Sequence, residues 1–180
     1  MFKQFLVSSL LLLGYYSLVY ADSDLLKHTF TSQKYRYSIQ YPNQWRPHDE
    51  GSGVVVFKDL PGKEAYTLVN IQTIYTKKAG GHYATVKDLM DDFISQVPKH
   101  TAGVKFFKRT TISLPQDQDE QGESVSLIFN ENGHQLKHWQ VMFLSKDGRF
   151  FQAWGYRAPV SSYEVNYPLA KAMLESWVIG

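Results

Sequence analysis

Cysteine is absent from this 180-residue chain. The absence excludes disulfide bonds, thiol nucleophiles and metal sites built on thiolates. It also excludes a lipid anchor attached to an N-terminal cysteine of a mature chain. Aromatic residues, in contrast, make up 15% of the chain, and large rings bury much area per residue. We therefore expect packing alone, much of it between aromatic side chains, to stabilise the fold.

Neither sign of charge dominates the sequence. Lys and Arg number 19 against 17 Asp and Glu, which gives a formal net charge of +2, and the chain has no basic stripe of the kind typical of nucleic-acid-binding surfaces. We therefore expect no nucleic-acid partner. The 43% hydrophobic and 20% charged residues are ordinary globular usage, which favours a folded domain over extended disorder.

The sequence has no strongly apolar run of about 20 residues, the length that a helix needs to cross a bilayer. The apolar stretch from Phe5 to Leu13 is about half that length. It follows Lys3 and precedes Val19-Tyr20-Ala21, an order typical of secretory signal peptides. The sequence predicts a signal peptide over residues 1–21, cleaved after Ala21; the alternative is a retained membrane anchor.

Cleavage would leave residues 22–180, a length that suits one domain with one core. We expect this single domain to have no transmembrane segment. It would work in the periplasm or outside the cell.

Two common catalytic motifs are missing as well. The chain has no Gly-x-Ser-x-Gly, which presents a nucleophile on a tight turn, and no His-Glu-x-x-His. We therefore expect no enzymatic activity and no cofactor. The alternative is a hydrolase with a dispersed active site, because the members of a serine, histidine and carboxylate set meet only in the fold.

Alternating apolar and polar residues predict strands in the first half of the chain. Residues 35–41 alternate between rings or aliphatic side chains and polar ones, which is typical of a half-buried strand. Pro42-Asn43 ends this strand, and Trp45 is expected in the turn that follows. Two β-branched segments, 53–58 and 67–75, predict two further strands.

The period then changes to that of a helix. Between Val86 and Val97, apolar residues fall three and four positions apart, with charged residues on the opposite side. Thr85 and Asp88 resemble a capping pair at the start of this helix, and Pro98 is expected to end it.

The second half of the chain predicts a meander of strands and a final helix. Asn132-Gly133 and Asp147-Gly148 favour tight hairpins. We expect the last helix to begin near Pro168, after a turn or short helix over 161–167. The expected strands are 104–113, 123–130, 136–145 and 149–157, with a connection over 115–122. One helix for each face of an antiparallel sheet gives the predicted fold class, α+β with an α/β/α sandwich.

Several of these residues together resemble the PsbP-like superfamily, which includes PsbP, DcrB-type and Mog-type proteins. The most specific part is the strand that ends in Tyr41-Pro42-x-x-Trp45; Val56-Phe57-x-Asp59, Val69-Asn70-Ile71, Gly148-Arg149-Phe150-Phe151 and Leu174-Glu175-Ser176-Trp177 add to it. The resemblance spans nearly all of the chain after the signal peptide. It implies an α/β/α sandwich of the bacterial periplasmic branch, with a role in binding or assembly. It supplies no catalytic residue set and no named partner.

Two patterns superficially resemble metal sites. His134 and His138 stand four apart, a spacing that pairs two ligands only on a helix, whereas a strand separates them by about 13 Å. Asp117 to Gly122 has the acidic spacing and the glycine of a calcium loop, but Ile128 occupies the position of the bidentate glutamate. We interpret both patterns as surface features and expect no metal.

The candidate binding residues are Trp45, Arg46 and His48, beside the glycine-rich turn Gly51-Ser52-Gly53. Trp and Arg are frequent anchors of binding surfaces, and loops often carry them. The alternative is that Trp45 closes the end of the core while Arg46 and His48 face solvent. The prediction that follows is an exported, non-catalytic accessory protein that binds a protein or a small molecule. Besides the hydrolase, the alternative is a structural subunit of an envelope or secretion assembly.

Overall fold

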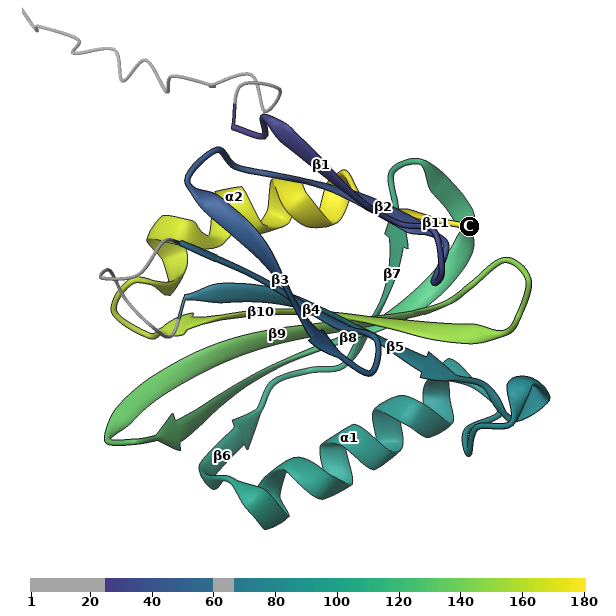
Figure 1. The fold of residues 1–180 in the computed structure, drawn as a ribbon. Helices are drawn as coiled ribbons and strands as arrows, with labels where there is room; N and C mark the ends of the chain where they lie inside the picture. Colours follow the sequence, from purple (N-terminus) through teal and green to yellow (C-terminus); the bar gives the residue numbers. More distant parts are fainter. Residues whose placement is uncertain (1–24, 60–66) are drawn as a thin grey trace, which may run out of the picture.

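The computed structural model describes residues 25–59 and 67–180. The predicted signal peptide, residues 1–21, lies outside the described residues, so its cleavage stays a prediction. Two antiparallel sheets, two α-helices and one short 3₁₀ helix, η2 (Lys77–Ala79), make up the described part (Figure 1). In this part, no helix combines the length and the apolar character that a membrane span requires.

The larger sheet has eight strands in the order β3-β4-β5-β10-β9-β8-β6, and β7 also pairs with β8. From edge to edge they are β3 (Trp45–Gly51), β4 (Val54–Asp59), β5 (Leu68–Tyr75), β10 (Phe150–Pro159), β9 (His134–Leu144), β8 (Asp117–Glu131) and β6 (Ala102–Phe106), with β7 (Thr110–Leu114). A smaller sheet contains β1 (His28–Ser32), β2 (Tyr37–Tyr41) and β11 (Val178–Ile179). The fold is therefore α+β and dominated by antiparallel sheet, as the sequence predicts.

The meander of β8, β9 and β10 confirms the hairpins expected from the turn residues. Asn132 and Gly133 have φ angles of 51° and 81°, the positive values that a two-residue hairpin turn requires. Gly148, in the next turn, has a φ of 68°. These turns place β9 and β10 side by side in the middle of the sheet.

Successive residues of β9 and β10 point to opposite faces of the sheet, and both sets are buried. On one face, Val141, Phe143, Trp154 and Tyr156 share a core with residues of α2 (Tyr163–Glu175) and of the smaller sheet. On the other face, Met142, Phe151 and Ala153 share a core with Leu89 and Met90 of α1 (Val86–His100). Figure 1 shows α2 above the sheet and α1 below it.

Helix α1 covers only one half of its face. Its most extensive contacts are with β6, β8 and β9, whereas β3, β4 and β5 form the other half of the sheet. Val54, Val56 and Leu68 on that half remain partly exposed. The boundary between the covered and uncovered halves is where the candidate site lies.

The N-terminus of α1 has the capping box that the sequence predicts. The Thr85 hydroxyl accepts a hydrogen bond from the Asp88 backbone N–H at 3.1 Å, and the Asp88 carboxylate accepts one from the Thr85 N–H at 3.0 Å. The end of the helix differs from the prediction: α1 runs two residues past Pro98, to His100. The exposed proline removes one N–H from the last turn but leaves the helical path of the chain intact.

Substituting Thr85 by alanine is expected to lower the free energy of unfolding by about 1 kcal/mol, because an N–H at the helix start loses its acceptor. Thr85→Ser keeps the hydroxyl and serves as the control, with a loss below about half of that value. Urea unfolding measures both. Equal losses in the two variants would contradict the capping role.

The structure differs from the sequence prediction at three strand boundaries. Trp45 is the first residue of β3 and not a turn residue. The strand expected over 104–113 is two strands, β6 and β7, which pair with different parts of the long β8. The connection expected over 115–122 is a tight turn, because β8 already begins at Asp117 and pairs with β7.

The last helix also begins earlier than expected, at Tyr163 and not near Pro168. Its first turn closes through the Asn166 N–H, which donates to the Ser162 carbonyl at 3.2 Å. The Tyr163 side chain is 2% exposed and anchors this turn in the core. Pro168 is exposed, so burial of Tyr163 outweighs the single N–H that the proline lacks.

Candidate functional site

A cavity of about 360 Å³ lies between α1 and the uncovered strands, and we call it the α1-face pocket. Most of its lining is apolar and comes from β4, β5, α1 and β8: Val54, Val56, Leu68, Phe93, Val97, Leu127 and Phe129. The polar side chains are Asn70, Thr101, Glu131, His138 and Arg157. An apolar cavity with a few convergent polar groups is the usual form of a small-ligand site.

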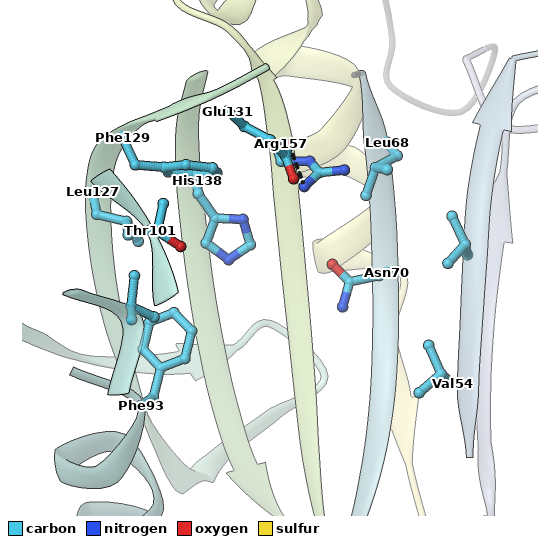
Figure 2. Close-up of a pocket in the computed structure, with 12 residues that line it drawn as sticks. Val54, Leu68, Asn70, Phe93, Thr101, Leu127, Phe129, Glu131, His138 and Arg157 are labelled. Carbon is cyan, nitrogen blue, oxygen red and sulfur yellow. Dashed lines mark hydrogen bonds and ion pairs between the residues drawn. The ribbon is translucent and has the colours of Figure 1, made fainter. Parts of the chain in front are cut away.

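Gly155 has no side chain at a point where two residues that line this pocket, Asn70 and His138, approach each other. Gly155 of β10 lies opposite Asn70 of β5 in the sheet ladder. A Cβ at this position would lie 2.7 Å from Asn70 Oδ1 and 2.7 Å from His138 Cε1. Figure 2 shows Asn70 and His138 extending toward the β10 strand from its two sides. Glycine therefore allows the amide and the imidazole to approach each other.

The His138 imidazole is fixed by a hydrogen bond to an amide. Its Nε2 lies 3.0 Å from Gln140 Oε1, and the Gln140 Nε2 donates to the carbonyls of Trp154 at 3.0 Å and Val141 at 3.2 Å. Because the amide nitrogen is committed to these carbonyls, the amide oxygen faces the imidazole and His138 donates from Nε2. Nδ1 of the neutral ring is therefore a hydrogen-bond acceptor.

Burial lowers the pKa of His138 to about 4, and the positive charge of Arg157 contributes in the same direction. The hydrogen bond to Gln140 opposes this shift. The Phe93 ring of α1 lies beside the imidazole, with ring centroids 6.2 Å apart. At neutral pH the site thus contains an uncharged imidazole.

The Arg157 guanidinium and the Glu131 carboxylate lie at one end of the pocket (Figure 2). Arg157 Nη1 lies 3.0 Å from Glu131 Oε2. In the described part of the chain, the buried Arg157 Nε has no hydrogen-bond partner. A buried donor without an acceptor costs about 1–3 kcal/mol, so an acceptor brought by a ligand would be stabilising here.

A second cavity, of about 350 Å³, extends the site along α1. It shares Asn70, Phe93 and Val97 with the α1-face pocket. Its far end is closed by Tyr83, whose hydroxyl donates to Asp92 at 2.7 Å. The two cavities form one groove between the helix and the sheet.

The structure separates the three residues predicted as a binding rim. Trp45 is 4% exposed and belongs to the core on the α2 side of the sheet. Arg46 and His48 are exposed and point to the other face, where His48 lies opposite Val56 in the ladder. Opposite residues of an antiparallel pair share a face. Arg46 and His48 are therefore on the same face as the α1-face pocket, while Trp45 packs in the core on the opposite face.

The two metal-like sequence patterns lie on strands, His134 and His138 on β9 and residues 117–122 on β8. His134 is exposed beside the hairpin turn, whereas His138 lines the pocket. Asp117 to Gly122 belong to β8, and Asp117 lies 2.6 Å from the Lys146 Nζ. Among residues 25–59 and 67–180, no group of three or more His, Asp or Glu side chains could hold a metal ion.

Asn70, Gly155 and Arg157 were not predicted as site residues from the sequence, and His138 was predicted only as half of a metal-like pair. These residues lie on three strands, and only the register of the sheet brings them together. One signal was present in the sequence: a glycine inside a bulky strand pattern often marks a close approach of neighbouring groups. Gly155, between Trp154 and Tyr156, is such a glycine.

The arrangement is better suited to binding than to catalysis. His138 is hydrogen-bonded to an amide and not to a carboxylate. Its low pKa makes the neutral ring a weak general base near pH 7, because an efficient base has a pKa close to the working pH. Apolar walls, an imidazole acceptor and an unpartnered guanidinium N–H can instead hold and orient a ligand.

The sequence matches no protein-family model, and no curated protein sequence matches it. In fold, the chain is similar to cyanobacterial PsbP (CyanoP) from Synechocystis, with 14% identity, a TM-score of 0.62, and coverage of 93% of this chain and 99% of that one. It is also similar to the Ran-binding protein Mog1p from Saccharomyces cerevisiae, with 7% identity, a TM-score of 0.58, and coverage of 86% and 96%.

A third similar structure is LpqN, involved in cell envelope biogenesis of Mycobacterium tuberculosis. It has 14% identity, a TM-score of 0.56, and coverage of 79% of this chain and 82% of that one. The chain therefore has the PsbP-like fold that the sequence predicts. Identities this low show a shared fold and nothing about function.

Proposed function

We propose that residues 22–180 form one exported, non-catalytic binding domain whose ligand occupies the α1-face pocket. The observation that carries this proposal is the convergence of Asn70, His138 and Arg157 in an otherwise apolar cavity, over a glycine that leaves room for them. The fold supports it, since the similar structures include a protein named for binding Ran. Family likeness supplies no partner, so the ligand is inferred from the chemistry of the pocket.

The ligand is an apolar group that carries a hydrogen-bond acceptor. Covering the apolar side chains of β4, β5, α1 and β8 with an apolar ligand removes them from water, which favours binding. The Arg157 Nε–H lacks an acceptor within the described residues. The neutral His138 ring can accept a hydrogen bond from an uncharged donor. A small amphiphilic molecule or one side chain of a partner protein has this chemistry.

A protein partner would rest on the uncovered half of the sheet. Arg46, Lys58 and Leu68 follow one another across β3, β4 and β5, and Leu68 is also a wall of the pocket. Arg46 and His48 therefore form the outer rim of the same face. In this proposal they contact the partner, while Trp45 supports the strand from the core.

The predicted signal peptide supports export of the protein. An exported protein would function in the periplasm or outside the cell. The fold likeness to LpqN, a protein of envelope biogenesis, is compatible with that location. The mass of the exported protein tests the proposal, because cleavage after Ala21 leaves a chain that begins at Asp22. A protein recovered from membranes with residues 1–21 attached would refute it.

The pocket can be tested with 8-anilinonaphthalene-1-sulfonate, which joins apolar rings to an anionic acceptor. The dye is expected to bind the native protein with increased fluorescence. Val56→Asp places a charge at the pocket wall and is expected to weaken binding at least about tenfold, or about 1.4 kcal/mol. Val165→Asp is the matched control, since Val165 is 80% exposed on α2.

Equal dye binding by the two variants would refute the pocket as the site. The hydrolase alternative is tested with the same protein on ester, peptide and glycoside substrates. Activity that disappears in a His138→Gln variant would defeat the binding-only proposal.

A further inference from the structure

A third cavity, also of about 350 Å³, lies on the opposite face of the sheet from the α1-face pocket. It opens between α2 and the strands β7, β8 and β9. Ser126 lies opposite Trp139 in the ladder, and Thr110 lies opposite Ser124, so both pairs share the α2 face. We call this cavity the α2-face cleft.

One wall of the cleft is aromatic. The rings of Trp139 and Tyr167 have centroids 5.5 Å apart and are tilted by 40°. Both side chains remain partly exposed, whereas Trp45, Trp154 and Trp177 are between 0% and 4% exposed. Trp139 is thus the tryptophan that a ligand in the cleft can reach.

The facing wall carries hydroxyl groups. Trp139 Nε1 donates to Ser124 Oγ at 2.6 Å, which fixes both side chains and leaves the Ser124 O–H as a donor. Thr110 and Ser126 also line the cleft. In the described part of the chain, neither of these two hydroxyls has a hydrogen-bond partner.

Charged groups complete the cleft at its rim. The Lys137 Nζ lies 2.8 Å from Glu164 Oε1 and 4.2 Å from the centroid of the Tyr163 ring. These two contacts hold the ammonium in place. Lys108 also lines the cleft, and within residues 25–59 and 67–180 it has no recorded ion pair.

A ligand must match both walls to bind here. A purely apolar ligand would displace the water that hydrates the hydroxyls and the ammonium groups. It would offer no hydrogen bonds in place of those that are lost. A small anion would leave the aromatic wall unused. A sugar ring offers both kinds of surface, because its C–H groups form an apolar face and its hydroxyls project from the edge.

We propose that the α2-face cleft binds a carbohydrate, one or two sugar units of a glycan. The sugar face packs on Trp139 and Tyr167, and its hydroxyls bond to Ser124, Ser126 and Lys137. The volume of the cleft is at the lower end of the range for small-ligand sites. This site is independent of the α1-face pocket, so a ligand there is not required for carbohydrate binding.

The test uses the mature protein on an array of neutral, amino and acidic glycans, followed by titration of the best-bound soluble oligosaccharide. Binding is expected to protect Trp139 from quenching by acrylamide, while the three buried tryptophans are already protected. Tyr167→Ala is expected to weaken binding at least tenfold, and Val165→Ala on the exposed side of α2 is expected to leave it unchanged.

Circular dichroism establishes that each variant is folded, and Ser126→Ala and Lys137→Gln replace Tyr167→Ala if that variant is not. Failure to bind any glycan at millimolar concentration would overturn the proposal. Binding that persists undiminished in these variants would place the glycan elsewhere and overturn it as well.

Discussion

A Gly155→Ala variant is expected to lose most of its ligand binding and about 1 kcal/mol of stability, although it adds one methyl group. The added Cβ would lie 2.7 Å from Asn70 Oδ1 and from His138 Cε1, so both side chains must move away from it. Because these atoms are side-chain ends and not backbone, the cost is expected near the lower end of the about 1–3 kcal/mol of overpacking. Gly155 does not have a left-handed φ, so the backbone itself accepts alanine. Dye titration and urea unfolding measure the two losses.

The control for this substitution is a double-mutant cycle with Asn70→Ala. Removing the amide eliminates one of the two close contacts, so part of the lost stability should return in the Gly155→Ala, Asn70→Ala protein. Coupling of this kind is expected for residues in contact and absent for independent sites. Strictly additive losses would show that Gly155 does not act through the space between Asn70 and His138.

Lowering the pH from 7 to 5 is expected to reduce the free energy of unfolding by about 2 kcal/mol through His138 alone. Its pKa is about 4 in the folded protein, below the ordinary value of 6.5. Between these values the unfolded chain binds a proton that the folded protein does not, so stability falls as the pH decreases. The loss begins near pH 6.5 and levels off below about pH 4.

The charged groups near His138 also favour a lowered pKa of its imidazole. Arg157 of β10 repels a protonated imidazole, and Glu131, which would attract it, is paired with Arg157. Carboxylates with lowered pKa values, Asp91, Asp92 and Asp147, affect stability at more acidic pH, below their ordinary value of 3.8. These carboxylates therefore contribute little between pH 7 and pH 5, and the His138→Gln variant separates His138 from the other histidines.

Urea unfolding at several pH values measures this slope. His138→Gln should remove most of it, because glutamine does not titrate. His48→Gln, at an exposed position of β3, should keep it. A wild-type protein whose stability is constant from pH 7 to pH 5 would show that the imidazole is not held neutral by burial.

Much of the fold could be predicted because local signals agree with the tertiary structure. The hairpin at Asn132-Gly133 and the capping box at Thr85 depend on residues close in sequence. The predictions failed where tertiary packing outweighs a local preference. Tyr163 starts α2 ahead of Pro168 because its buried ring anchors the turn, and β1 was missed because its pairing with β2 determines it.

The candidate site was less predictable than the fold. Arg46 and His48 could be recognised as exposed polar residues, but strand alternation turns Trp45 to the other face. Asn70 and Arg157 look like ordinary strand residues until the register places Asn70 opposite Gly155 and Arg157 opposite His138. A site assembled across three strands leaves no spacing pattern along the chain.

A ligand in the α1-face pocket would change the amide chemical shifts of the residues around it. A ¹⁵N-labelled mature protein would be titrated with 8-anilinonaphthalene-1-sulfonate. The predicted result is a set of shifts concentrated at Asn70, His138, Gly155 and Arg157, which disappears in the Gly155→Ala variant. Shifts that are absent from these residues, or that persist in that variant, would show that the dye does not occupy the α1-face pocket.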